Sequence, residues 1–511
     1  MTLRRGLISG ARHRDHATIE QNAMRAAAGL RALGVKPGDA VALLLRNDLV
    51  FFEASFAAQA AGIYAVPINW HLAPAEVGYI LEDSEAKVLV AHADLLAHVQ
   101  ERVPEGVTIL VQPTPPEIVD AYGLDAGEAE PRPGAALWEQ WLAGFEPLAK
   151  PYPQKAETMM YTSGTTGLPK GVRRAMQTPE QAAAMAAMRD MVYGVRPGIR
   201  ALVAGPLYHA APNSFGLRAA RVADAVVLMP RFDAKAFLDL VRAERITTTF
   251  MVPTMFVRLL KLPDEVRAAA DLTSLGYVMH AAAPCPSEVK RRVIDWFGSI
   301  VHEFYGGTEG GYWTLCNSEE WLSKPGTVGR PPNGVILKAL DADGNEVPVG
   351  TPGQLYGRLL HFPDFTYNKR EAARREIERD GLITIGDVGY FDDDGFVFIC
   401  DRAKDMVVSG GANIYPAEIE AELLHMAGVA DGAVFGIPDA EFGEKLMAVV
   451  QPQPGVALSA DAIIDHLRRH IAGFKVPRVI EFRDTLPRGD DGKIIKRRLR
   501  DPYWQGHERN V

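Results

Sequence analysis

The sequence predicts an α/β protein with a large N-terminal domain of β-α-β units, containing mixed or parallel sheets, and a small α+β C-terminal domain. Short apolar runs of strand length alternate with helical patterns over the first 100 residues, and this alternation resumes after Arg200. Near residue 400 the pattern changes to a Gly-rich segment that is followed by a compact unit. A chain of 511 residues is long enough to form two or more packed cores.

The first elements are expected to form a parallel sheet. Thr18 and Gln21 predict a capping box at the start of a helix that stops near Gly34. Helices are also expected over about 49–61 and 74–82. Apolar runs at 41–45, 64–68 and 87–91 have the length and composition of strands covered on both faces. This β-α-β order predicts right-handed crossovers.

The same alternation is expected at 201–206, 225–229 and 247–252, with a helix over 232–244. The segment 113–153 is rich in Pro, Gly and acidic residues, and it is predicted to be an exposed connection. The domain boundary is placed at 401–405, so that residues 1–400 form the large domain and 406–511 the small one. In the small domain a helix is expected to open at Pro416 and another to cover 461–470.

Composition excludes several classes of protein. Hydrophobic residues make up 47% and charged residues 23% of the chain, which argues against a disordered or collagen-like protein. There are 55 Lys and Arg against 64 Asp and Glu, and this net charge of −9 argues against nucleic acid as the main partner. The three cysteines are far apart, which favours neither disulfides nor a CxxC metal site. With no signal peptide or apolar run of membrane-spanning length evident, we expect a cytoplasmic location.

The most informative segment is 161–171, which reads YTSGTTGLPKG. Its glycines, hydroxyls and Lys170 can present backbone N–H groups, O–H groups and an ammonium to polyphosphate oxygens. The Walker spacing is not met, because Pro169 stands five residues after Gly164 where that motif needs glycine. From composition alone, a surface turn rich in Gly, Ser and Thr is an equally good interpretation.

Four more segments extend the pattern along the chain. They read YGGTEGG at 305–311, ITIGDVGYFDDDGF at 383–396, DRAKDMVVSGGANIYPAEIE at 401–420 and PRGDDGKIIKRRLR at 487–500. Together with 161–171, these segments resemble the adenylate-forming (ANL) superfamily, which contains acyl-CoA synthetases, beetle luciferases and the adenylation domains of peptide synthetases. They occur in the family's order and at similar intervals, so the resemblance covers nearly the whole chain.

The resemblance implies a site for ATP and Mg²⁺. Glu309 and Thr162 are implied to hold a Mg²⁺ ion that bridges phosphates, and Thr308 to lie near an α-phosphate oxygen. Taken alone, Glu309 would more simply be a solvated surface carboxylate. The implied ATP-binding residues are Thr162, Ser163, Gly164, Thr165, Thr166, Gly167, Lys170, Ala282, Ala283, Pro284, Tyr305, Gly306, Asp387 and Arg402.

Three of these residues have a more specific implied task. Asp387 is implied to accept hydrogen bonds from the ribose hydroxyls, although its position also suits an Asx turn. Arg402 is implied to be a second ribose or phosphate contact, and Tyr305 to stack on adenine. The adenine wall corresponds to HAAAP at 280–284, where relatives often have glycine and where alanines would keep the wall flat.

The resemblance also implies that the small domain is mobile. Lys493 is implied to reach into the large domain and stabilise the transition state between the acid carboxylate and the α-phosphate. Its basic neighbours at 496–500 are expected to be solvated, and no task is evident for Asp490 and Asp491.

A second half-reaction needs a thiol at the same site. Lys404 matches the hinge about which the family's small domain rotates. Gly410 and Gly411 match the lining of the pantetheine tunnel, although a purely structural Gly-Gly bend is an alternative. Val408 stands where luciferase-like relatives carry lysine, which argues against luminescence.

The acid is expected to bind beside His209, which matches the family's gate histidine, although a lone histidine is more often structural. Small residues next to His209 suggest a roomy cavity that suits a bulky, aromatic or medium- to long-chain acid. The implied pocket residues are His209, Ala211, Asn213, Phe215, Val252 and Tyr312.

These expectations give one main hypothesis and two alternatives. The main hypothesis is an ATP-dependent acyl-CoA synthetase that acts through an acyl-adenylate, with ATP, CoA and the acid as partners and Mg²⁺ as cofactor. The alternatives are an adenylation enzyme that loads a carrier protein and an inactive nucleotide-binding homologue. Neither nucleic acid nor a membrane span is expected, and the sequence leaves a homodimer open.

Overall fold

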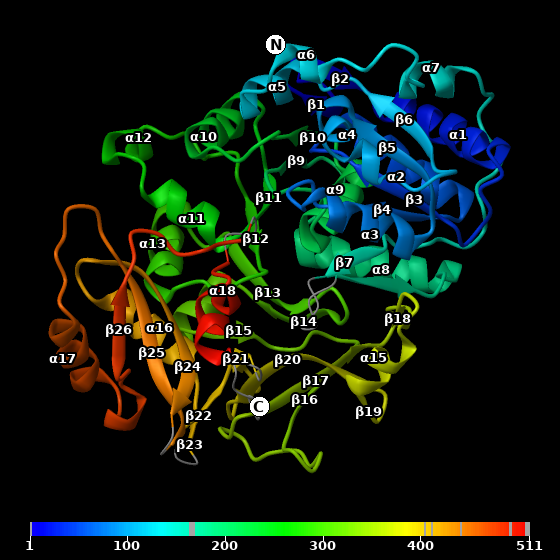
Figure 1. The fold of residues 1–511 in the computed structure, drawn as a ribbon. Coiled ribbons are helices and arrows are strands. Elements are labelled where there is room, and N and C mark those ends of the chain that lie inside the picture. Colours follow the sequence, from blue (N-terminus) through cyan, green and yellow to red (C-terminus); the bar gives the residue numbers. More distant parts are fainter. Residues whose placement is uncertain are drawn as a thin grey trace.

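The chain forms a large unit of layered sheets and helices and a smaller unit at its C-terminal end, drawn in orange and red in Figure 1. The computed structural model describes residues 3–162, 169–402, 405–409, 412–439, 442–489 and 493–505. The predicted α/β fold class, with a large N-terminal and a smaller C-terminal domain, is confirmed.

One sheet runs through the middle of the large unit. Its strands lie in the order β14 (Gly311–Cys316), β13 (Val301–Gly307), β12 (Tyr277–His280), β11 (Thr248–Met251), β9 (Arg200–Val203), β10 (Ala225–Leu228), β1 (Gly6–Ser9) and β2 (Arg12–Arg14). Neighbours from β13 to β1 are parallel, whereas the edge strands β14 and β2 pair antiparallel. The strands predicted after Arg200 are confirmed, and α10 (Ala234–Ala243) lies between β10 and β11.

A second, fully parallel sheet follows the predicted β-α-β order. It consists of β4 (Tyr64–Pro67), β3 (Ala40–Leu44), β5 (Ala86–His92) and β6 (Thr108–Gln112). The predicted helices are present as α2 (Leu49–Ala61) and α3 (Pro74–Ser84). Gly62 ends α2 with a φ of 72°, a left-handed conformation that glycine adopts without a steric penalty.

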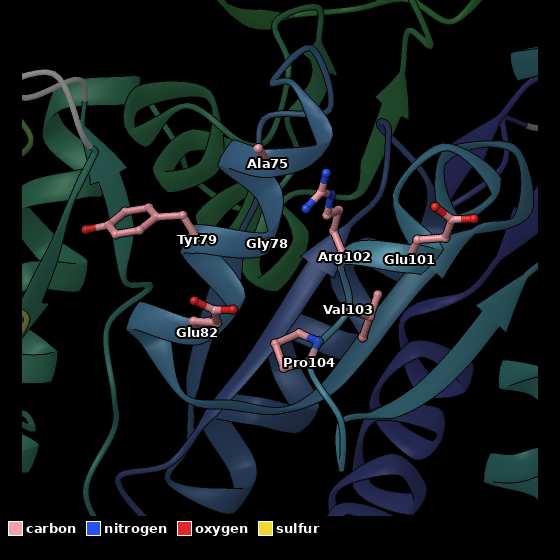
Figure 2. Close-up of a pocket in the computed structure, with 8 residues that line it drawn as sticks. All are labelled: Ala75, Gly78, Tyr79, Glu82, Glu101, Arg102, Val103 and Pro104. Carbon is pink, nitrogen blue, oxygen red and sulfur yellow. The ribbon is translucent and has the colours of Figure 1, made fainter.

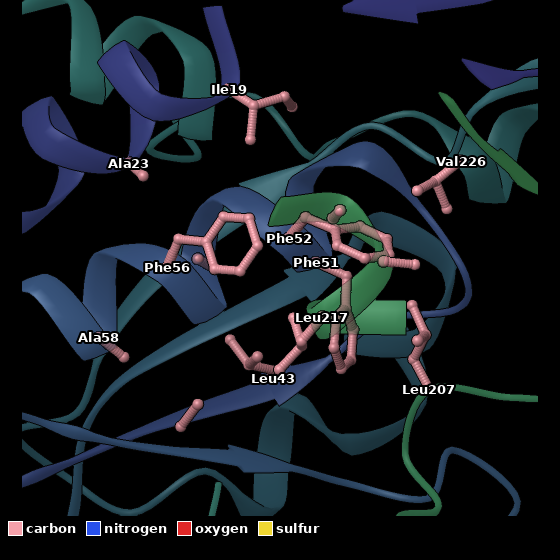
Figure 3. Close-up of a cluster of buried hydrophobic side chains, with 14 of the residues drawn as sticks. Ile19, Ala23, Leu43, Phe51, Phe52, Phe56, Ala58, Leu207, Leu217 and Val226 are labelled. Carbon is pink, nitrogen blue, oxygen red and sulfur yellow. The ribbon is translucent and has the colours of Figure 1, made fainter. Parts of the chain in front are cut away.

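Helix α2 is apolar on almost every side, and its side chains are packed against both sheets (Figure 3). Phe51, Phe52 and Phe56 belong to one buried cluster with Leu43 of β3 and Val226 of β10. A helix with no polar face is stable only when it is covered on all sides. The composition of α2 therefore explains why it lies inside the large unit.

The capping box predicted at Thr18 is wrong. Helix α1 (His16–Ala32) begins two residues earlier, and Asp15 caps it by accepting a hydrogen bond from the backbone N–H of Thr18 at 2.7 Å. Aspartate is as good an N-cap as threonine, and here it stands directly before the first helical residue.

The segment 113–153 is not the exposed connection that its composition predicts. It contains α5 (Pro116–Tyr122), α6 (Ala126–Ala129) and α7 (Trp138–Ala143). The Trp138 side chain is fully buried, and its indole N–H donates to Glu53 Oε2 at 3.0 Å. Glu53 lies in α2 and also accepts hydrogen bonds from Arg14 and Asn22. The hydrogen bond to the buried Glu53 carboxylate therefore fixes this segment against the core.

Two antiparallel sheets complete the large unit. The first has the order β18 (Phe365–Tyr367), β8 (Lys170–Arg174) and β7 (Met160–Thr162). The second has the order β15 (Thr327–Gly329), β21 (Val397–Arg402), β20 (Leu382–Phe391), β17 (Gly353–Leu359) and β16 (Val335–Leu340), with β19 (Glu378–Arg379) beside β20. Because β21 continues to Arg402, the first two residues of the segment 401–405 belong to this sheet.

The C-terminal unit has its own sheet and core. Its strands are β23 (Ala412–Ile414), β22 (Val407–Ser409), β25 (Gly443–Pro452), β24 (Val429–Asp439) and β26 (Val479–Phe482). Helices α16 (Pro416–His425) and α17 (Ala460–His470) share the buried residues Ile419, Leu423, Ile463 and Leu467. The helices predicted at Pro416 and over 461–470 are therefore confirmed.

The basic tail is only partly solvated, so that expectation needs correction. Helix α18 (Lys496–Arg500) packs on β24 through the buried Leu499. The ammonium of Lys496 lies 2.8 Å from Glu420 Oε1, and Arg500 donates to Asp405 at 3.4 Å. Arg497 and Arg498 are exposed, as expected.

The remaining helices cover the faces and edges of these sheets (Figure 1). They are α4 (Ala93–Val99), α8 (Pro179–Tyr193), α9 (Ala210–Val222), α11 (Pro253–Leu260), α12 (Asp264–Ala268), α13 (Ser287–Phe297), α14 (Ser318–Ser323), α15 (Glu371–Glu376) and the 3₁₀ turns η1 (Gln100–Arg102), η2 (Gly473–Lys475) and η3 (Asp501–Trp504). None of the helices in the described ranges has both the length and the apolar character that crossing a bilayer requires.

We expect Trp138→Ala to lower the free energy of unfolding by about 3–5 kcal/mol, because it empties a buried site and removes a donor from Glu53. Trp138→Phe keeps most of the volume and should cost about 1–3 kcal/mol. The measurement is urea unfolding followed by circular dichroism. Gln140→Ala, an exposed change on the same helix, is the control. Equal stability of Trp138→Ala and this control would contradict the packing described here.

Candidate active site

Glu309 lies in the turn between β13 and β14, and its carboxylate accepts hydrogen bonds from two hydroxyl groups. Thr162 of β7 donates its Oγ1–H to Glu309 Oε1 at 3.3 Å, and Tyr367 of β18 donates its O–H to the same oxygen at 3.1 Å. Burial and the Glu309 charge raise the pKa of Tyr367, which keeps this phenol protonated as a donor. The structure thus brings together Thr162 and Glu309, the residues predicted to hold Mg²⁺.

Arg174 fixes the backbone on either side of that carboxylate. Its buried guanidinium donates to the carbonyl oxygens of Thr308 and Glu309, both at 2.6 Å, and of Pro363 at 2.9 Å. Burial lowers its pKa to about 10, so the group remains charged at neutral pH. The sequence analysis missed Arg174, although its place at the end of β8, directly after the Gly-rich segment, was an available signal.

A second carboxylate site is formed by Asp387, Tyr305 and Arg402. Tyr305 of β13 donates its O–H to Asp387 Oδ2 at 2.8 Å, and Arg402 Nε lies 2.9 Å from Asp387 Oδ1. Asp387 and Arg402 face each other on the paired strands β20 and β21. Burial and the Asp387 charge raise the pKa of Tyr305 well above its usual value. Asp387 lies inside a strand, not in the Asx turn that was the alternative interpretation.

Strand β13 links the two carboxylate sites, because Tyr305 belongs to it and Glu309 is the second residue after its end. The close approach of β13 and β14 depends on Gly306, which was predicted to contact ATP. A Cβ at Gly306 would lie 1.9 Å from the carbonyl oxygen of Gly311. Glycine is therefore needed here for the turn itself.

The predicted adenine wall, 280–284, begins at the last residue of β12, the neighbour of β13. Ala282 has a φ of 77°, a left-handed conformation that costs a residue with a Cβ on the order of 1 kcal/mol. The alanines were interpreted as a mild variation that keeps the wall flat. In the structure, Ala282 instead occupies a backbone position at which glycine would be relaxed.

Four of the six residues predicted to line the acid pocket lie in α9 or directly before it, namely His209, Ala211, Asn213 and Phe215. Phe215 and Tyr312 are buried members of one hydrophobic cluster, and Ala211 and Val252 pack against it. Asn213 is already engaged by the protein, since its Nδ2 donates to the Leu207 carbonyl at 2.9 Å. His209 is the residue before α9, and its ring contacts that of Tyr208.

A polar group next to this cluster was not foreseen. The Tyr312 hydroxyl lies 2.7 Å from Ser214 Oγ and 3.3 Å from the Tyr193 hydroxyl. Arg189 donates to Ser214 at 3.1 Å and pairs with Glu157 at 2.6 Å. Hydrogen-bonding groups therefore border an otherwise apolar and aromatic region.

Several predicted residues cannot be placed. Ser163 to Gly167, Lys404, Gly410, Gly411, Asp490 and Asp491 lie outside the described residues. Lys170 begins β8, with its ammonium 5.1 Å from the centre of the Tyr367 ring. Lys493 is exposed, and its carbonyl accepts a hydrogen bond from the Gly489 N–H.

Two hollows in the surface lie elsewhere. A hollow of about 370 Å³ lies between α3 and η1, where Tyr79 points away from Arg102 (Figure 2). A second hollow of about 710 Å³ is bordered by Ile8, Val227 and Phe232. No predicted site residue lines either of them among the described residues.

Comparison with known proteins identifies the family. A family model described as AMP-binding enzyme matches residues 4–359, and one described as AMP-binding enzyme C-terminal domain matches residues 418–493. The chain belongs to the AMP-binding enzyme family. The first match includes Glu309 and its partner Thr162, whereas Asp387 and Arg402 lie between the two matches.

Individual relatives agree with this assignment. The chain is 35% identical over 496 residues to a feruloyl-CoA synthase of an Amycolatopsis species, covering 95% of this chain and 93% of the relative. It is 32% identical over 514 residues to the fatty acid–[acyl-carrier-protein] ligase ScoC of Streptomyces coeruleorubidus, covering 96% and 92%. The ATP-bound structure of MatB from Rhodopseudomonas palustris matches with a TM-score of 0.84 at 27% identity, covering 99% and 97%. The resemblance to the adenylate-forming superfamily is thus confirmed, and an AMP-forming ligase is supported.

We expect Arg174→Met to lower the free energy of unfolding by about 2–4 kcal/mol, because it leaves three carbonyl oxygens without their donor. Amide hydrogens at 307–311 should exchange faster, which mass spectrometry can measure. Arg173→Met, a change at the neighbouring and less buried arginine, is the control. Unchanged exchange at 307–311 in Arg174→Met would show that this arginine does not hold the turn.

Proposed function

We propose that the protein is an ATP-dependent acyl-CoA synthetase that converts a carboxylic acid, ATP and CoA into acyl-CoA, AMP and pyrophosphate. The observation that carries this proposal is the pair of hydrogen-bonded carboxylates, Glu309 and Asp387, linked by β13 in a chain of the AMP-binding enzyme family. Glu309 suits a Mg²⁺ ion bound to the phosphates, and Asp387 suits the ribose hydroxyls of the same nucleotide.

The nucleotide is held by groups of opposite character. Asp387 accepts the ribose hydroxyls while Arg402 balances its charge, and Lys170 with the Gly-rich loop before it contacts the phosphates. Tyr305 stacks on the adenine. Arg174 keeps the backbone of Thr308 and Glu309 fixed, so that the charges facing ATP do not need to reorganise during the reaction.

The donor set around Glu309 fits Mg²⁺. Glu309 and the hydroxyl of Thr162 are hard oxygen ligands that already lie within hydrogen-bond distance of each other. When bound, Mg²⁺ would neutralise phosphate charge and orient the phosphates. Tyr367 would keep the second contact of Glu309 and so hold the orientation of the carboxylate.

The reaction takes place in two steps. A carboxylate oxygen of the acid attacks the α-phosphorus of ATP, the bond to pyrophosphate breaks, and Lys493 stabilises the negative charge that develops. After a rotation about Lys404, the CoA thiolate enters past Gly410 and Gly411, attacks the acyl carbonyl and releases AMP. His209 lies at the entrance to the acid pocket.

The acid is a bulky, aromatic or medium- to long-chain compound. The rings of Phe215 and Tyr312 both contact that of Tyr193 inside a hydrophobic cluster, and such surroundings suit an apolar or aromatic acyl group better than acetate. The similarity to a feruloyl-CoA synthase supports the aromatic option. A cytoplasmic location stays part of this proposal.

The main test is acid-dependent exchange of labelled pyrophosphate into ATP. We expect Lys493→Ala to slow this exchange by about 10²–10³-fold, the usual loss when one positioned donor to the transition state is removed. Arg497→Ala, in the same basic tail, should leave it unchanged. Equal exchange in Lys493→Ala and the wild-type protein would remove Lys493 from the proposed mechanism. The absence of exchange with every acid of a broad aliphatic and aryl panel would favour an inactive homologue.

Free CoA is expected to be the acceptor, and a carrier protein is the specific alternative, because one relative is named as an acyl-carrier-protein ligase. With an acid that supports exchange, the wild-type protein should form acyl-CoA at least tenfold faster than it acylates a phosphopantetheine-bearing carrier. Liquid chromatography with mass spectrometry measures both products. Preferential acylation of the carrier would be consistent with the proposed adenylation step, but it would show that a carrier protein and not free CoA is the acceptor.

A further inference from the structure

The C-terminal unit carries a cluster of imidazoles and a carboxylate that the proposed reaction does not use. Glu422 lies on α16, and His466 and His470 lie one turn apart on α17. His466 Nε2 is 2.8 Å and His470 Nδ1 is 3.5 Å from the same oxygen, Glu422 Oε1. Figure 1 shows α17 on the outer side of the C-terminal unit, away from β7 and β18. The cluster is therefore separate from the Thr162–Glu309 site.

We propose that Glu422, His466 and His470 form a binding site for a divalent transition-metal ion of the zinc type. One ligand atom from each residue lies within 4.8 Å of the other two. In a tetrahedral zinc site with bonds of about 2.0–2.1 Å, ligand atoms are separated by roughly 3.3 Å. Small side-chain rotations would close this difference, because His470 is exposed and the other two are half-buried.

The backbone already holds the two helices at the required distance. Ile419 and Leu423 of α16 pack with Ile463 and Leu467 of α17 in one buried cluster. This packing places the histidines of α17 opposite Glu422, so that the metal would not need to assemble the helices. A preformed ligand set loses less conformational entropy on binding.

The hydrogen bonds of the cluster suit metal binding. His470 Nδ1 lies 2.7 Å from the carbonyl oxygen of His466, and it must donate to that acceptor. This bond leaves the lone pair of a neutral His470 on Nε2, the arrangement commonly found around metal-bound histidines. Because Nδ1 is the atom that lies near Glu422, at 3.5 Å, the His470 ring would have to turn for Nε2 to bind the ion. His425 supplies a further imidazole, with its Nδ1 3.3 Å from the other Glu422 oxygen.

The donor atoms select the kind of ion. Imidazole nitrogens with one carboxylate favour Zn²⁺, Cu²⁺, Ni²⁺ or Co²⁺ over Mg²⁺ and Ca²⁺, which prefer sites made of oxygens only. Nearby cations have partners of their own, since Lys475 pairs with Glu418 at 2.7 Å and Arg468 lies 3.8 Å from Asp465. Three protein ligands leave a coordination position for water.

The test is zinc binding by the full-length, metal-stripped protein in competition with a chromophoric chelator. We expect one Zn²⁺ per chain with at least 100-fold preference over Mg²⁺. His466→Gln and His470→Gln should each weaken binding tenfold or more, and glutamine retains a side-chain amide that can donate to Glu422. Cobalt(II) bound at the site should give the visible absorption of a four-coordinate ion, and the double variant should lose it.

Two controls localise the ion. His98→Gln, at an exposed histidine of α4, and Glu309→Gln, at the proposed nucleotide site, should both leave zinc affinity unchanged. Circular dichroism of the metal-free variants checks that each is folded, and His470→Gln at the exposed end of α17 is the milder change. The proposal is overturned if no stoichiometric zinc binds, if Mg²⁺ competes equally, or if the folded double variant keeps an affinity within twofold of wild type.

Discussion

A single buried charge, the guanidinium of Arg174, organises the part of the molecule where both carboxylate sites meet. It comes from β8 and binds carbonyl oxygens of the β13–β14 turn and of Pro363, which are far apart in sequence. A buried cation is costly unless its donors are satisfied, and a buried carbonyl oxygen is costly without a donor. The arginine and the turn therefore require each other. The hydrogen bonds from Arg174 to the Thr308 and Glu309 carbonyls therefore fix the position of Glu309, at the centre of this turn.

The parts of the fold that were predictable from sequence are those fixed by local composition. The helix 49–61 was evident because it is mostly apolar and ends at Gly62, and both features are local. The segment 113–153 was not predictable in this way. Its burial depends on the contact of Trp138 with Glu53, and neither this pairing nor the half-buried Arg14 and Asn22 beside Glu53 can be inferred from Pro and Gly content.

The candidate site divides along the same line. The resemblance named five residues that the structure joins into two separate groups. Thr162 contacts Glu309 in one group, and Asp387 contacts Tyr305 and Arg402 in the other. The resemblance did not name Arg174 or Tyr367, because their contacts with the β13–β14 turn cross 58 or more residues and involve backbone carbonyls or a single hydroxyl. The strain at Ala282 was also not predicted, because the glycine that relatives often have in 280–284 was connected with a flat adenine wall and not with a left-handed φ.

The junction between the two units places a further constraint on the proposed rotation. Asp401 and Arg402 end β21, and Arg402 is held in the large unit by Asp387. The adjacent Asp401 carboxylate accepts a hydrogen bond from the Ala417 N–H at the start of α16, which belongs to the small unit. Beyond the proposed hinge, Asp405 is bound by Arg500 of the tail. A rotation about Lys404 can keep the ribose pair and the tail pair intact, because each lies wholly on one side of that residue. The Asp401–Ala417 bond spans it, and so do the bonds from the Asp405 and Met406 N–H groups to the Arg402 carbonyl oxygen. These contacts would have to stretch or break when the small unit turns.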